Sequence, residues 1–393
     1  MAHRASKLAV GIVSLLMPLS LVAGAQAQSP TTSEAAAAAL GPGEGAAFAM
    51  TNATRNNQIV SYRRAADGSL TRVGSVSTRG AGIGVDLDAQ SPLELSTDHR
   101  YLYAVNAGTD EVSVFAVDGT NLTFVQKVYA GDEPVSLTIH ENLLYVLNGS
   151  VAGNGITGFT RAADGTLTQL PDSFRLLSSP IAVPGEVQFS PDGRLLVVTE
   201  KTTNTLLTPA NALDVFQVNA AGVPSATPRR NASTGLRPFS MAFRNNNQLL
   251  VTESFNAAES QAAVSSYLVS RAGAFVPVSR SVPNQQTDTC WIVITDDGRY
   301  AFTANFGSGT ISSYRIDAAG RIQLVEGNAA FTGTDSQPVD LALSADSHYL
   351  YLLLRGTGAV ASFEIGSDGS LTSLGIVTGG LPVADGASGL AVY

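Results

Sequence analysis

The chain has 393 residues, of which 44% are hydrophobic, 14% charged and 7% aromatic, and its formal net charge is −9. The apolar content excludes a disordered protein, and the acidic balance argues against nucleic acid or an anionic membrane as a partner. A single cysteine excludes an intramolecular disulfide framework and any Cys-based zinc or iron–sulfur site.

The first 27 residues have the features of an export signal. Arg4 and Lys7 precede an apolar run, and Ala25-Gln26-Ala27 supplies small residues before a cleavage point. The run is too short for a spanning helix. We therefore expect a signal peptide over residues 1–27 that is cleaved after Ala27, and a flexible linker over 28–44. The mature protein should be secreted or periplasmic, with no transmembrane segment.

From residue 45 onward the chain repeats two phrases about every fifty residues. One is a strand, a tight turn and a second strand, as in VQFSPDGRLLVVTE (187–200). The other is a strand, a glycine turn and a further strand, as in VASFEIGSDGSLTSL (360–374). The turn glycines are Gly68, Gly119, Gly165, Gly222, Gly273, Gly320 and Gly369. Asp-Gly turns suit tight hairpins, and four strands per unit of this length are typical of a β-propeller blade.

The two ends of the repeat region complete each other. AAFAMTN (46–52) supplies a second strand without an innermost one, whereas ASGLAVY (387–393) is an innermost-strand phrase with nothing after it. We therefore predict an all-β domain over residues 45–393. It should be a seven-bladed β-propeller of four-stranded antiparallel blades, closed by the C-terminal strand pairing into blade one.

The phrases SPDGRLLVVTE, STDHRYLYAVN and TDDGRYAFTAN, each followed by a V/I-S-x-[FY] strand, resemble the seven-bladed lactonase family. That family includes 6-phosphogluconolactonase-type proteins and 3-carboxymuconate cyclases, and the resemblance covers residues 46–393. It implies His and Arg at the innermost-strand starts of the middle blades. Here those places read PGEVQF (184–189), RPFSMAF (237–243) and TCWIVI (289–294), and only Glu253 matches the family pattern.

Two positions per blade are expected to line the upper mouth of the channel. The starts of the first strands carry Glu94, Ser136, Glu186, Ser240, Trp291, Asp340 and Ser388. The ends of the second strands carry Asn52, Asn106, Asn148, Glu200, Glu253, Asn305 and Arg355. Arg237 directly precedes the start of the first strand of blade five.

We expect Glu253 to be the catalytic base, with Glu200 and Glu186 beside it to raise its pKa, because carboxylates cluster around a cation, a shared proton or a ligand. The expected substrate-binding residues are Arg237, Ser240, Trp291, Asp340, Arg355, Asn106, Asn148 and Asn305. The same asparagines also fit a structural turn role, and the acidic set also fits a solvated rim. The histidines that remain after signal removal, His99, His140 and His348, fall in lower turns, which argues against a histidine triad or zinc site at the mouth.

Two functions remain open at this point. One is an exported hydrolase that acts on a lactone or sugar-acid ring with a carboxylate base. The other is a non-catalytic binding or scaffold propeller that faces a glycan or an envelope protein. The small-molecule partner would be a lactone or a carbohydrate, and the protein would be a monomer. No cofactor is required, although the carboxylates with Asn106 or Asn148 could hold one divalent cation.

Overall fold

The computed structural model describes residues 40–151, 153–179, 181–201, 211–244 and 247–393. The expected signal peptide and residues 28–39 of the expected linker lie outside the described residues. Glu44, at the end of that linker, already belongs to the folded domain because it forms an ion pair with Arg63. Within these ranges, no helix has the length and apolar character needed to cross a membrane.

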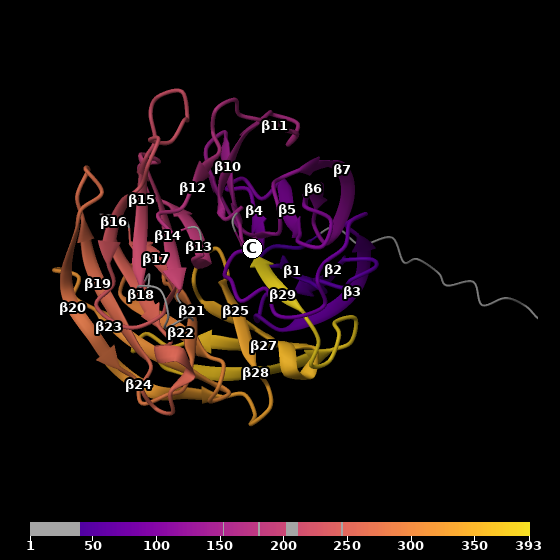
Figure 1. The fold of residues 1–393 in the computed structure, drawn as a ribbon. Coiled ribbons are helices and arrows are strands. Elements are labelled where there is room, and N and C mark those ends of the chain that lie inside the picture. Colours follow the sequence, from indigo (N-terminus) through magenta and orange to yellow (C-terminus); the bar gives the residue numbers. More distant parts are fainter. Residues whose placement is uncertain (1–39, 152, 180, 202–210, 245–246) are drawn as a thin grey trace, which may run out of the picture. The chain divides into compact units, whose positions relative to one another are not determined.

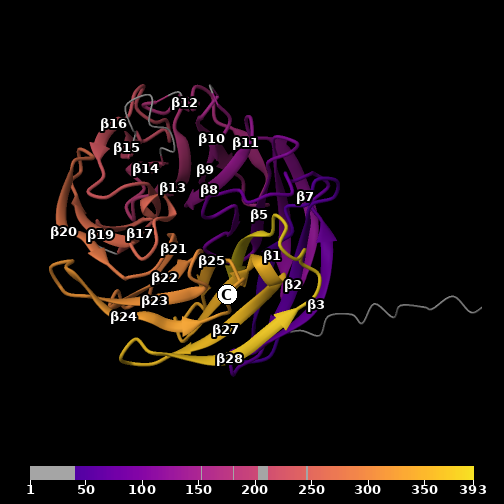
Figure 2. The same cartoon turned by 60° about the horizontal axis from the view of Figure 1, so that its bottom comes forward.

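The strands form seven antiparallel sheets, which are the blades of a propeller (Figures 1 and 2). From the channel outward, blade one contains β29 (Ser388–Val392), β1 (Gly45–Met50), β2 (Gln58–Arg64) and β3 (Leu70–Ser77). Blade two contains β4 (Leu93–Leu95), β5 (Tyr101–Asn106), β6 (Glu111–Asp118) and β7 (Asn121–Tyr129). Blade three contains β8 (Pro134–His140), β9 (Leu143–Asn148), β10 (Gly155–Arg161) and the split outer pair β11 (Leu167–Gln169) and β12 (Arg175–Leu176).

Blades four to seven contain β13 (Val183–Phe189), β14 (Leu195–Lys201), β15 (Ala212–Gln217) and β16 (Arg229–Ala232); β17 (Pro238–Arg244), β18 (Gln248–Glu253), β19 (Ala263–Val269) and β20 (Phe275–Pro283); β21 (Thr289–Ile294), β22 (Tyr300–Asn305), β23 (Thr310–Ile316) and β24 (Ile322–Phe331); and β25 (Pro338–Leu343), β26 (Tyr349–Leu354), β27 (Ala359–Ile365) and β28 (Leu371–Thr378). Two short 3₁₀ turns, Phe255–Ala257 and Arg355–Thr357, follow β18 and β26.

The ring closes as the sequence predicts. The C-terminal strand β29 pairs antiparallel with β1, with Phe48 opposite Ala391 and Ala49 opposite Leu390. Each innermost strand contacts the innermost strand of the next blade, and β29 contacts both β25 and β4 (Figure 1). The two ends of the chain therefore share one sheet, which closes the ring of blades.

Neighbouring blades are also joined by a contact that recurs around the ring. The Tyr351 hydroxyl donates to the carbonyl of Gly68 at 2.9 Å, and Tyr103 makes the same contact with Gly165 at 3.1 Å. Both glycines have a positive φ, and a Cβ on Gly68 would lie 2.3 Å from the Tyr349 ring. The repeated glycine turn is therefore needed both for the hairpin and for close packing against the adjacent blade.

Candidate functional site

The asparagines at the ends of the second strands lie inside their blades. Asn106 donates to Ser113 at 2.8 Å, Asn148 to Thr157 at 3.1 Å and Asn305 to Ser312 at 2.8 Å. All three asparagines are fully buried, and each partner stands two residues into the third strand of the same blade. Their amides therefore join the second and third strands and do not reach the channel, contrary to the expected substrate-binding role.

Glu253 occupies the equivalent position in blade five and is fully buried. Its carboxylate accepts hydrogen bonds from the Thr234 hydroxyl at 2.9 Å, the Gly235 amide at 2.9 Å, the Ser265 hydroxyl at 2.5 Å and the Ser281 hydroxyl at 2.6 Å. Four donors satisfy a buried carboxylate well. Glu253 is thus held as an internal acceptor of its blade.

Glu200 occupies the same position in blade four, but its partner on the third strand is another carboxyl group, Asp214. Both side chains are fully buried. Burial and then the charge of Asp214 raise the pKa of Glu200 to about 7, while the Ser178 hydroxyl, 3.0 Å from the carboxylate, acts against the rise. Two adjacent carboxyl groups that cannot both ionise share one proton. This shared proton links the second and third strands of blade four.

Glu186 lies in a different place, on the channel wall, where its carboxylate accepts a hydrogen bond from the Met241 amide at 2.6 Å. Its nearest charged neighbours are Glu94 and Asp340, and not Glu200 or Glu253. The expected convergence of Glu186, Glu200 and Glu253 at one opening is therefore wrong. The strand-end residues face inward between the strands of their own blades, whereas residues at the strand starts face the channel.

The carboxyl groups that do come together are Glu94, Glu186 and Asp340, which surround a chamber within the channel. Two connected pockets of about 310 and 300 Å³ are lined by these residues together with Ser91 and Gln188. Burial raises the pKa of Glu94 and that of Asp340 to about 7, and raises the pKa of Glu186 well above its usual range. Burial thus extends the protonated form of these carboxyl groups from the acidic range up toward neutral pH.

These carboxyl groups also fasten neighbouring blades together. Glu186 of blade four bonds the Met241 amide of blade five, and Asp340 of blade seven accepts from the Gly389 amide at 2.7 Å. In the same way, the Ser136 hydroxyl of blade three accepts a hydrogen bond from the Val187 amide of blade four at 3.3 Å. The polar residues at the innermost-strand starts therefore act as inter-blade bridges.

The segment Val85–Ser91, between β3 and β4, covers the chamber, and we call it the plug. The backbone amide of Gln90 donates to the Gly185 carbonyl at 3.0 Å. The side chain of Gln90 donates a hydrogen bond to the Glu186 carboxylate and accepts one from the Ile292 backbone amide. The Ala89 carbonyl accepts from the Trp291 indole at 3.1 Å. Because these contacts reach blades four and six, the plug spans the channel and separates the chamber from the outer face.

A second charged cluster, which we call the mouth cluster, lies on the outer side of the plug and consists of Asp88, Lys201, Arg237 and Asp288. The Asp88 carboxylate contacts the Lys201 amine at 2.8 Å and the Arg237 guanidinium at 2.9 Å. Burial acts to raise the pKa of Asp88, but Lys201 and Arg237 outweigh it and lower the pKa below its usual value. Asp88 is therefore held as an anion.

Asp288 and Arg237 also line an open pocket of about 450 Å³ together with Asn256 and Ala257. Burial raises the pKa of Asp288, with the Cys290 thiol and Arg237 opposing the rise. The thiol lies 3.3 Å from the Asp288 carboxylate. The pocket thus presents a cation beside a carboxyl group whose pKa is shifted toward neutrality, which is a useful pairing for acid–base chemistry.

Asp288 and Arg237 occupy the same position of the repeat, directly before the innermost strand, as do Glu133 and Gln337. All four have a positive φ, and the carbonyl of each accepts a hydrogen bond from the backbone amide of the residue after the adjacent second strand. This position forms the rim of the mouth. The sequence hints at it, because proline follows three of the four: Glu133, Arg237 and Gln337.

The remaining predicted residues have mixed outcomes. Arg355 lies one residue beyond the end of β26 and reaches the mouth, where it contacts Asp86 of the plug at 3.5 Å and Gln337 at 3.0 Å. Ser240 instead bonds the Cys290 carbonyl inside the ring. Trp291 is buried beneath the plug against Phe239, with ring centroids 4.9 Å apart, so it is not free to stack on a sugar.

Comparison with known proteins places this geometry in a family. A family model described as Lactonase, 7-bladed beta-propeller, matches residues 38–184 and 252–340, which together make up more than half of the chain. The chain belongs to the seven-bladed β-propeller lactonase family. The interval between the two matched ranges contains Glu186, Lys201 and Arg237.

Relatives of this lactonase-family chain are distant. A 6-phosphogluconolactonase of Yersinia enterocolitica is 24% identical over 320 residues, which cover 70% of this chain and 94% of that protein. A putative 6-phosphogluconolactonase of Bacteroides fragilis has a similar fold, with a TM-score of 0.68, 17% identity and coverage of 88% of this chain and 99% of that one. A periplasmic gluconolactonase of Pseudomonas aeruginosa also has a similar fold, with a TM-score of 0.63, 17% identity and coverage of 88% of this chain and 99% of that one.

Two further expectations for this lactonase-family chain concern a bound cation at the mouth and the positions of the histidines. Over the described ranges, no group of three or more His, Cys, Asp or Glu side chains is arranged to hold a metal ion. Asn106 and Asn148, the expected cation ligands, are engaged inside their blades. His140 ends β8 at the lower side, and His348 pairs with Asp346 in a lower turn.

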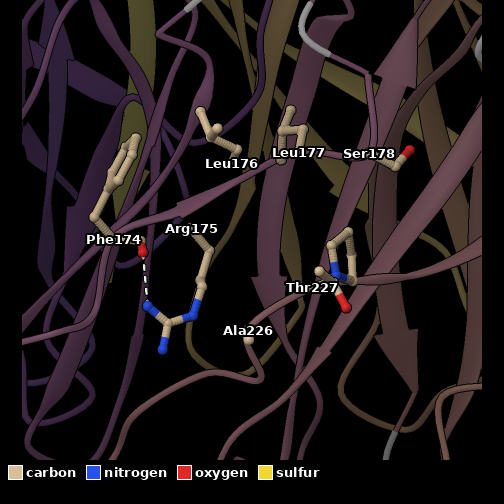
Figure 3. A pocket seen from close by; sticks show the side chains of 8 residues that line it. Phe174, Arg175, Leu176, Leu177, Ser178, Ala226 and Thr227 are labelled. Carbon is tan, nitrogen blue, oxygen red and sulfur yellow. Dashed lines mark hydrogen bonds between the residues drawn. The ribbon is translucent and has the colours of Figure 1, made fainter.

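A larger pocket of about 720 Å³ lies away from the mouth, between the outer parts of blades three and four (Figure 3). Its apolar lining includes Phe174 and Leu176, which are about half exposed, and Arg175 folds back to the Phe174 carbonyl. The described residues that line it include no carboxyl, imidazole or thiol group. The pocket therefore lacks the groups that lactone chemistry needs.

Proposed function

We propose that this protein is a lactonase that hydrolyses the lactone of a sugar acid in the pocket between Arg237 and Asp288. The observation that carries the proposal is the pairing, in one open pocket of about 450 Å³, of a guanidinium and a carboxyl group of raised pKa. Membership in the lactonase family and the relative named 6-phosphogluconolactonase support the same reaction class.

In this proposal, Asp288 takes a proton from a water molecule as its oxygen attacks the lactone carbonyl. The carbonyl oxygen becomes an oxyanion, which the Arg237 guanidinium stabilises. When the ring C–O bond breaks, Asp288 returns the proton to the leaving alkoxide, so that one water and one lactone give one hydroxy acid. Asp288 takes over the role that the sequence assigned to Glu253, because the Glu253 carboxylate is fully buried and has four donors.

Substitution of Asp288 tests this assignment. Asp288→Asn should lower kcat on 6-phospho-D-glucono-1,5-lactone by about a hundredfold or more, measured as acid release, with a melting temperature close to that of the unaltered protein. Glu133→Gln is the matched control, since Glu133 has the same rim position in blade three and a pKa that burial also raises. Its kcat should stay within about twofold of the unaltered protein.

Two results would decide against the proposal. If Asp288→Asn retains its rate, Asp288 is not the base. If the unaltered protein turns over no member of a panel of sugar-acid lactones, the alternative of a non-catalytic binding propeller is favoured. Glu253→Gln should lower stability through lost hydrogen bonds without a selective fall in kcat, so a specific loss of turnover in that variant would return the base role to Glu253.

We further propose that the protein acts outside the cytoplasm. The basic start, apolar run and Ala25-Gln26-Ala27 support export, and one relative of similar fold is named a periplasmic gluconolactonase. Expression of the full chain in a bacterium with an outer membrane should give a periplasmic protein whose N-terminal residue is Gln28. Recovery of an uncleaved chain from the cytoplasm would contradict export.

A further inference from the structure

The two halves of the plug are held by different kinds of interaction. The backbones of Ala89, Gln90 and Ser91 are fixed by hydrogen bonds with the Trp291 indole, the Gly185 carbonyl and the Leu137 amide, which donates to the Ser91 carbonyl at 2.9 Å. The carboxylates of the outer half form ion pairs, Asp86 with Arg355 and Asp88 with Lys201 and Arg237, and the Lys201 amine also donates to the Asp88 backbone carbonyl. The ion pairs of the outer half can therefore be exchanged for pairs with another anion while the hydrogen bonds of the inner half remain.

The seat occupied by Asp88 requires an anion. The Lys201 side chain is completely buried, and its amine lies 4.1 Å from the Phe239 ring centroid. Burial lowers the pKa of Lys201 and the Asp88 carboxylate opposes this fall, so the buried ammonium depends on an anion at this position to stay charged. Asp88 is 37% exposed and Arg237 16%, so an anion from solvent can approach Arg237 directly, and it reaches Lys201 once the Asp88 carboxylate moves aside.

We propose that Asp88 is an autoinhibitory latch, which occupies Lys201 and Arg237 until another anion takes its place. The inference rests on the proposed function, because Arg237 belongs both to this seat and to the pocket where the lactone would bind. Replacing one anion by another keeps Lys201 paired, so the exchange avoids the desolvation penalty of an unpaired charge. A neutral sugar of the same size cannot make that exchange. The latch thus admits ligands that carry a carboxylate or a phosphate.

The chain contains its own reporter of the latch. Trp291 is the single tryptophan of the sequence, and its indole donates to the Ala89 carbonyl of the plug. The ring packs against Phe239, the same ring that Lys201 covers. Displacement of Asp88 should therefore change the intrinsic fluorescence of the protein.

The first experiment compares two probes at constant ionic strength, D-gluconate and its neutral analogue D-sorbitol, which lacks the carboxylate. Gluconate should change Trp291 fluorescence in a saturable way, and sorbitol should not. Asp88→Asn, which removes the internal competitor, should bind gluconate about tenfold more tightly, since the competent state no longer has to displace an internal anion. Asp164→Asn is the matched control, because Asp164 is an exposed turn aspartate in blade three, and its affinity should be unchanged.

A second measurement uses the unaltered protein, in case Asp88→Asn fails to fold. Amide hydrogen exchange should become faster at residues 86–88 when gluconate binds, while the amides of Gln90 and Ser91 keep their protection. Exchange at 86–88 that is unchanged or slower with gluconate would overturn the latch, as would Asp88→Asn binding no tighter than the unaltered protein. These results are separate from the lactonase proposal, which fails instead if Asp288→Asn keeps its turnover.

Discussion

Asp88 of the mouth cluster and the carboxyl groups of the chamber are all at least partly buried, but their pKa values are shifted in opposite directions. In the mouth cluster, Lys201 and Arg237 lower the pKa of Asp88 in spite of its burial. In the chamber, burial is the largest influence on Glu94, Glu186 and Asp340, and it raises the pKa of each. No Lys or Arg side chain of the described residues forms an ion pair with these three.

The contrast shows that cations, and not burial alone, determine what a carboxyl group does in this protein. A paired carboxylate such as Asp88 stays ionised and can exchange with another anion. An unpaired one such as Glu186 is better suited to hold a proton and to bridge two blades. Charged residues at one end of a propeller channel therefore need not form one site.

The largest expected effect comes from removing the buried cation of the mouth cluster. Lys201→Met should lower the free energy of unfolding by about 3 kcal/mol, because Asp88 and the plug lose their buried partner. Lys127→Met is the matched control: Lys127 forms a partly exposed pair with Glu111 at 2.9 Å, and its loss should cost about 0.5 kcal/mol. Urea denaturation at pH 7 measures both. Equal losses in the two variants would contradict the distinction between a buried and a surface pair.

The chamber predicts the pH dependence of stability. For Glu94 the folded-state pKa of about 7 lies above the usual glutamate pKa of 4.5, so the folded protein binds more protons than the unfolded chain between these pH values. Its stabilising contribution is complete below pH 4.5 and is lost as pH rises through about 7. Glu94→Gln should remove this loss and gain about 2 kcal/mol relative to the unaltered protein between pH 5 and pH 8.

Chemical denaturation across that pH range checks this prediction, with Glu364→Gln, an exposed substitution on β27, as the control that should leave the pH profile unchanged. If the Glu94→Gln profile has the same slope as that of the unaltered protein, the chamber carboxyl is not the source of the pH dependence.

The smallest effect should come from the shared proton of blade four. Glu200→Gln supplies an amide donor to Asp214 at every pH, so it should stabilise the protein by about 1 kcal/mol at pH 8 and change little at pH 5, below the pKa of about 7. Glu253→Gln should destabilise at both pH values, since an amide nitrogen cannot accept the hydrogen bonds that the carboxylate accepts. If both variants gain stability at pH 8, the carboxyl groups of Glu200 in blade four and Glu253 in blade five do not differ in the way proposed.

The repeat pattern was sufficient for the fold but not for the site. Hydrophobic strands and turn glycines recur at each blade, so blade number, strand order and ring closure followed from local features. The rule that strand ends face the mouth was wrong for Glu200 and Glu253. The Glu200 and Glu253 side chains meet groups on the third strands of their own blades, Asp214 and Ser265, and the rim is formed one residue before the first strand, by Arg237 and Asp288.

The sequence by itself determined the seven-bladed architecture and its closure by the C-terminal strand, because both depend on short patterns that repeat along the chain. Only the tertiary structure decided which charged residues meet. Gln90 bonds the Ile292 amide 202 residues away, and Asp88 meets Arg237 149 residues away. The plug residues read locally as an ordinary loop, and their position over the channel arises only when the ring brings distant blades around one axis.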